Sequence, residues 1–243
     1  MFFYYFQSEA EFILYLLMLI VAIGMMLVGF MFRRTFNRYS TQLSMTRMTG
    51  AQVAERILRG EGISGVRVMP CRGQLTDHYN PSDRTVYLSQ SVYNSTSVAA
   101  LGVAAHEMGH AIQHERGYVP LRLRSAMVPV LNITQRFAFI ALLFGFLLDI
   151  FLFGGFSFFA WIGVAFYGLY TLFTFVTLPV ELNASKRAMA ALGDMGILSR
   201  EEKAPARKVL TAAACTYLIS FAYSLLQLLR LVAILSRSSN RRR

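Results

Sequence analysis

Long apolar runs constrain this 243-residue chain more than any other feature of its sequence. They cover residues 11–32, 131–153, 156–178 and 209–235. Each is long enough to cross a bilayer as a helix, which takes about 20 residues. Only 15% of the residues are charged, whereas soluble domains carry about 25%. We therefore expect an α-helical membrane protein with three to four transmembrane helices.

Basic residues at the ends of these runs predict how the chain crosses the membrane. Arg33 and Arg34 directly follow the first run, so the positive-inside rule places the chain after them in the cytoplasm. Gly154-Gly155 joins the second and third runs as a tight hairpin, residues 131–178, which returns the chain to that side. Because the basic residues behind the net charge of +11 cluster at such ends, we expect contact with the lipid bilayer and none with nucleic acid.

The last run, residues 209–235, leaves two interpretations open. It is long enough to cross the membrane, and we favour that interpretation. A polar stripe through Thr216 and Ser220 is also typical of a helix that packs against other parts of the protein.

Residues 40–130 are more polar and predict a small α+β unit. Thr49 can cap a helix from Gly50 to about Arg59. Short strands are expected at residues 66–69 and 85–88, with turn residues between them. Ser95 or Ser97 then begins another helix.

That helix carries the motif His-Glu-x-x-His, as His106-Glu107-Met108-Gly109-His110. Residues four apart lie on one face of a helix, so both imidazoles can bind the same zinc ion. Glu107 lies beside them, where it can take a proton from a water molecule that the metal activates. The motif therefore predicts a zinc-dependent hydrolase, with His106 and His110 as ligands and Glu107 as the catalytic base.

A catalytic zinc site keeps three protein ligands and one open position, so a third ligand is needed. His114 lies eight residues after His106, a helical rise of about 12 Å, and one zinc ion cannot reach both. His114 is more typical of a residue that supports the ligands, contacts the substrate or lies on the surface. Glu181 is the better candidate, because the hairpin returns residues 179–208 to the cytoplasmic side. The alternative is a glutamate placed near a helix start by the helix dipole.

Several segments together resemble the bacterial YugP-type neutral zinc metallopeptidases, and more distantly the gluzincin membrane proteases of the HtpX and Ste24 kind. They are residues 76–81, 86–89, 97–114 and 179–185. The resemblance implies a zincin-like catalytic unit in a bacterial inner-membrane protein. The basic residues after the first run imply that its active site faces the cytoplasm. The resemblance also implies His106, His110 and Glu181 as zinc ligands. Asn183 belongs to the matched Asn-Ala-Ser segment, and Ser185 stands where the more distant families have aspartate.

His78 and Tyr79 lie in a loop that we expect at the edge of the sheet. Peptidases of this type bind an extended substrate on an edge strand and need a hydrogen-bond donor for the oxyanion. Either residue could be that donor, and His78 is the one we favour. Tyr79 could instead contact the substrate, or the segment could be a turn with an aromatic packing residue.

Together these features predict a zinc endopeptidase that cleaves membrane or membrane-proximal proteins or peptides. One alternative is a site-2-type intramembrane protease. Glu115 and Arg116 directly follow the motif, and the apolar stretch from Val98 into it is too short to span a bilayer, which argues against that alternative. Another is a non-catalytic membrane protein with a structural metal site, although such a site would normally have four protein ligands.

Overall fold

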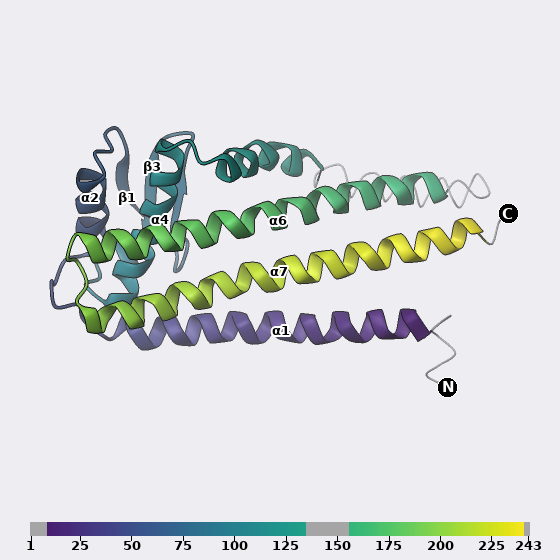
Figure 1. Ribbon diagram of the computed structural model, residues 1–243, viewed down its shortest axis with the longest axis horizontal. Helices are drawn as coiled ribbons and strands as arrows, with labels where there is room; N and C mark the ends of the chain where they lie inside the picture. Colours follow the sequence, from purple (N-terminus) through teal and green to yellow (C-terminus); the bar gives the residue numbers. More distant parts are fainter. Residues whose placement is uncertain (1–8, 135–155, 241–243) are drawn as a thin grey trace. The chain divides into compact units, whose positions relative to one another are not determined.

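The computed structural model describes residues 9–134 and 156–240 (Figure 1). It confirms the prediction of a mainly helical protein with a small sheet. Among the described residues, three stretches are helical, long and apolar enough to cross a membrane: Phe12–Ser40, Trp161–Asp194 and Arg200–Ala233. They belong to helices α1 (Glu9–Ser40), α6 (Phe156–Asp194) and α7 (Arg200–Asn240). The predicted apolar run at residues 131–153 lies outside the described residues from position 135 onward.

The chain divides into two compact units. The first consists of residues 1–26, 123–177 and 218–243, and the second of residues 27–122 and 178–217. In the first unit, α6 and α7 are joined by buried hydroxyl groups. The Thr174 and Ser224 hydroxyls lie 2.9 Å apart, and the Thr171 hydroxyl donates to the backbone carbonyl of Ser224. These bonds satisfy polar groups inside a largely apolar pair of helices.

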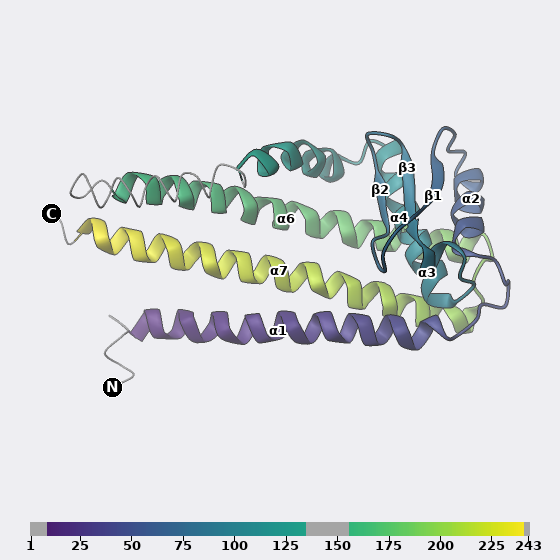
Figure 2. The same ribbon diagram turned by 180° about the vertical axis from the view of Figure 1, so that it is seen from behind.

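The second unit contains a three-stranded sheet with the order β1-β3-β2 (Figure 2). Its strands are β1 (Arg67–Cys71), β2 (His78–Asn80) and β3 (Thr85–Ser89). β1 runs parallel to the central strand β3, whereas β2 pairs with it in the antiparallel direction. The predicted strands at 66–69 and 85–88 correspond to β1 and β3. The segment expected to be a loop at His78 and Tyr79 forms the edge strand β2 instead.

Helix α4 (Val98–Glu115) is the centre of the second unit's core. Ser97 is its N-cap, and the Ser97 hydroxyl accepts a hydrogen bond from the backbone N–H of Ala100. The predicted helix after Thr49 is α2 (Gly50–Gly60), which begins with a capping box formed by Thr49 and Gln52. α2 and the strands pack on α4 through fully buried apolar side chains: Val53, Ile57, Val86, Leu88, Leu101 and Met108. A short helix, α3 (Gln90–Tyr93), joins β3 to the segment before α4.

Candidate metal centre

Three side chains of the second unit converge on one point. His106 and His110 come from α4 and Glu181 from α6, and their ligand atoms all lie within 4.8 Å of one another. The Glu181 Oε2 atom is 3.1 Å from Nε2 of His106 and 3.6 Å from Nε2 of His110. Ligand atoms around a tetrahedral zinc ion, with bonds of about 2.1 Å, are separated by about 3.4 Å. The donor set and its spacing therefore fit one zinc ion.

Gly109 allows α4 and α6 to come close enough for this arrangement. A Cβ atom at position 109 would lie 2.4 Å from the carbonyl oxygen of Ala184, a distance that real Cβ atoms essentially never show. Ala184 is fully buried and lies three residues after Glu181. The glycine inside the motif is thus required by the close contact with the segment that carries the third ligand.

Gln113 holds His110 and was missed by the sequence analysis. Its side-chain nitrogen donates to the Val180 carbonyl over 2.8 Å and to the Asn183 side-chain oxygen over 3.0 Å. Its side-chain oxygen therefore faces Nδ1 of His110, 3.0 Å away, and accepts a hydrogen bond from it. A proton on Nδ1 leaves Nε2 of His110 free to bind a metal. Gln113 follows His110 by three residues on the same helix, and this spacing was the available signal.

Ser185 supports the other histidine. Its hydroxyl lies 3.2 Å from Nδ1 of His106 and can accept the proton of that nitrogen. Ser185 thus provides His106 with a neutral hydrogen-bond acceptor. Asn183 does not touch the histidines through any described contact. It accepts hydrogen bonds from Gln113 and from Nε of Arg187, and so positions Gln113.

Glu107 is buried beside the ligands, with 7% of its surface exposed. Burial raises its pKa from 4.5 to about 7, and the negative charges of Glu181 and Asp77 act in the same direction. The charge of His106 and a hydrogen bond from the backbone N–H of Tyr79 lower the pKa, but by less. A carboxyl group with this pKa can both accept and donate a proton near neutral pH. Its assignment as the base stays a prediction.

His114 and Tyr79 bind each other. The Tyr79 hydroxyl lies 2.7 Å from Nδ1 of His114, which links β2 to the end of α4. His114 does not belong to the one group of possible metal ligands found among the described residues. The ring of His78 stacks on Tyr87, with 5.0 Å between ring centroids, and its Nδ1 lies 2.8 Å from the Thr76 carbonyl oxygen. A role for His78 or Tyr79 towards the substrate stays a prediction.

The fold and the site define a class: a mainly helical protein with a two-histidine, one-glutamate metal centre beside a buried glutamate, as in zinc metallopeptidases. The chain belongs to the family described as "Putative neutral zinc metallopeptidase", whose model matches residues 14–236. It is 39% identical over 222 residues to the "Putative membrane protease YugP" of Bacillus subtilis (strain 168). That alignment covers 91% of this chain and 96% of the relative. No solved structure matches.

These comparisons confirm the resemblance found in the sequence, and they confirm zinc as the metal of this family. The relative's name and the three apolar helices also support a membrane protein.

Proposed function

We propose that this protein is a membrane-embedded zinc endopeptidase that hydrolyses peptide bonds of membrane or membrane-proximal proteins. The observation that carries the proposal is the convergence of His106, His110 and Glu181 beside the buried carboxyl group of Glu107. Three protein ligands leave the fourth position of a tetrahedral site open, as catalytic zinc sites require. Zinc bound there would supply a Lewis acid that polarises the peptide carbonyl and lowers the pKa of water towards neutrality.

The chain's own groups then handle the protons. Glu107 accepts a proton from the attacking water and delivers it to the leaving amine, which its pKa of about 7 allows. The Tyr79 N–H holds the Glu107 carboxyl group in place from the edge strand β2. Gln113 and Ser185 keep Nδ1 of the two histidines protonated, so that both Nε2 atoms face the metal position.

We also propose that the site faces the cytoplasm from the inner membrane of a bacterium. Arg33 and Arg34 follow the first apolar run, and the positive-inside rule places such residues in the cytoplasm. The motif helix α4 is not among the helices of the described residues that are both long and apolar enough to cross a membrane, and it packs in the same core as β3. This favours a site outside the hydrocarbon region over a site-2-type intramembrane site. With the native Cys71 and Cys215 replaced by serine, Glu115→Cys at an exposed position should react with a membrane-impermeant thiol reagent in inverted vesicles and not in intact cells.

The central test compares detergent-purified wild type with Glu107→Gln, and measures bound zinc and cleavage of an unfolded casein-like protein. We expect about one zinc in each protein and cleavage by wild type only, with a loss of at least about 100-fold in the variant. Equal cleavage by both proteins would remove Glu107 from the mechanism. Zinc in both proteins without cleavage of casein or of any membrane-protein substrate would favour the structural-metal alternative.

A further inference from the structure

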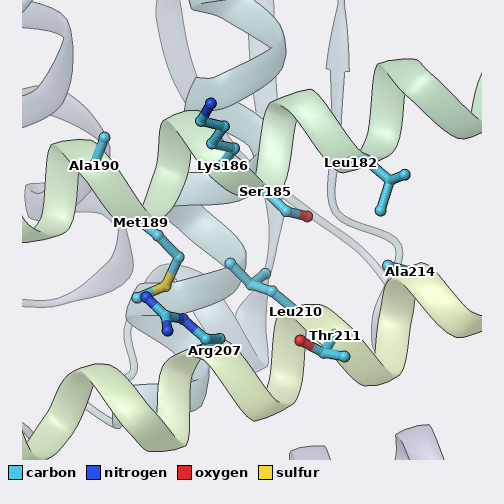
Figure 3. Close-up of a pocket in the computed structure, with 9 residues that line it drawn as sticks. All are labelled: Leu182, Ser185, Lys186, Met189, Ala190, Arg207, Leu210, Thr211 and Ala214. Atoms are coloured by element: carbon cyan, nitrogen blue, oxygen red, sulfur yellow. The ribbon is translucent and has the colours of Figure 1, made fainter.

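A groove between α6 and α7 in the second unit adjoins the metal centre but is lined by none of its three ligands. Figure 3 shows its lining side chains on two facing helix segments, residues 182–190 and 207–214. Its volume is about 450 Å³, within the range of roughly 300–1,000 Å³ that small-molecule sites occupy. The lining is mostly apolar, with two basic residues: Leu182, Ser185, Lys186, Met189, Ala190, Arg207, Leu210, Thr211 and Ala214.

Polarity changes along the length of this groove. Leu182 and Ala214 line one end, and Figure 3 shows these two residues together on one side. Ala214 lies within the apolar run 209–235, and Leu182 follows the run 156–178. Arg207 lines the other end, where it lies opposite Met189 in the same view. Lys186 lines the groove between these ends, and Figure 3 shows its amino group on the side away from α7. The groove is therefore apolar at the end of Leu182 and Ala214 and cationic at the end of Arg207.

The two basic side chains have no anionic partner in the described part of the chain. No carboxylate oxygen there lies within ion-pair distance of Lys186 or Arg207, although such pairs do form elsewhere in this unit, as between Arg84 and Glu115. Both side chains are also exposed, so a negatively charged group can reach them without a change in the fold. The charge of the groove therefore selects an anionic ligand, and its apolar remainder selects one with a hydrocarbon chain.

We propose that this groove binds an anionic phospholipid of the surrounding membrane. The phosphate lies at Arg207, and one acyl chain runs along Met189 and Leu210 towards Leu182 and Ala214. Basic pockets between helices at a membrane surface bind anionic headgroups in this way. A neutral lipid lacks the charge to match the basic end. The proposal depends on the membrane insertion proposed above and not on peptidase activity.

The groove also touches the metal centre, because Ser185 both lines it and contacts Nδ1 of His106.

The test titrates detergent-purified protein with phosphatidylglycerol or phosphatidylcholine and counts bound lipids by native mass spectrometry. Wild type should retain one phosphatidylglycerol in preference to phosphatidylcholine. Arg207→Gln should weaken phosphatidylglycerol binding roughly fivefold. Lys208→Gln is the matched control, since it removes the same charge from the neighbouring exposed residue of α7, which does not line the groove.

A second pair of variants tests the apolar end. Ala214→Phe should fill it and abolish the bound lipid, whereas Cys215→Phe changes an exposed neighbour outside the groove and should not. Equal retention of both lipids, or equal effects of Arg207→Gln and Lys208→Gln, would overturn the proposal. So would loss in Ala214→Phe without any headgroup preference, which would indicate an apolar polypeptide segment as the occupant. Glu107→Gln should bind phosphatidylglycerol like wild type, which separates lipid binding from the proposed catalysis.

Discussion

Gly109 offers a direct test of how the metal centre is assembled. In Gly109→Ala, the new methyl group would lie 2.4 Å from the Ala184 carbonyl oxygen, whereas real Cβ atoms keep at least 3.0 Å. The segment of α6 must therefore move away from α4 by at least about 0.6 Å. Distances between zinc and its ligands tolerate only about 0.2 Å. Because Glu181 lies one helical turn before Ala184, we expect zinc affinity to fall by roughly 10- to 100-fold.

Gly102→Ala is the matched control for this substitution. Gly102 lies in the same helix, two turns earlier, and its added methyl group would lie 3.8 Å from Cβ of Ala206, an ordinary contact. Alanine also favours a helix by about 1 kcal/mol over glycine, so this variant should fold at least as well as wild type. Zinc affinity of both purified variants can be measured by competition with a chelator. Wild-type affinity in Gly109→Ala, or an equal loss in both variants, would refute this explanation of the close contact.

Three further predictions concern the ligands and their surroundings. Gln113→Leu should lower zinc affinity by roughly 10- to 100-fold in chelator competition, because His110 loses the acceptor that fixes its tautomer. Glu181→Ala should reduce the bound zinc far more than Ser185→Ala, because Glu181→Ala removes a ligand whereas Ser185→Ala removes only a hydrogen bond. Metal analysis of both purified variants would measure this difference. In zinc-free protein, the raised pKa of Glu107 means that the folded state binds more protons than the unfolded chain between pH 4.5 and 7. The free energy of unfolding should therefore fall by on the order of 3 kcal/mol as pH rises through that window, which thermal denaturation would show. Glu107→Gln should lack this pH dependence. A parallel pH dependence in wild type and Glu107→Gln would contradict this assignment.

Local patterns in the sequence were sufficient for the existence of the long helices and for two of the ligands. The helix start expected near Glu181 was wrong, because α6 continues through Pro179. Spacing along one helix brings His106 and His110 together whatever the rest of the fold does. The apolar runs predicted α1, α6 and α7 from length and hydropathy alone. Glu181 was predicted from the side of the membrane to which the hairpin returns. Membrane topology selects a segment of the chain and does not give a distance, so the approach of Glu181 to the histidines needed the structure.

The features that the sequence did not predict depend on tertiary contacts. β2 is three residues long and exists because Tyr79 and its neighbours pair with β3, so no alternating pattern marks it. Gln113 is polar yet fully buried, and its partners Val180 and Asn183 lie in another helix. Helical periodicity describes which face of a helix is buried, but it does not say which buried polar group meets which acceptor.

The hydrogen bonds behind the two imidazoles have a chemical consequence for the proposed peptidase. The acceptors are the Gln113 amide and the Ser185 hydroxyl, and both are neutral. A carboxylate in either position would make the imidazole a stronger electron donor and would add a negative charge to a site that already holds Glu181 and Glu107. Neutral acceptors fix the tautomer of each histidine without that charge. They therefore preserve the positive charge that a metal brings to the site, and with it the polarisation of the substrate carbonyl.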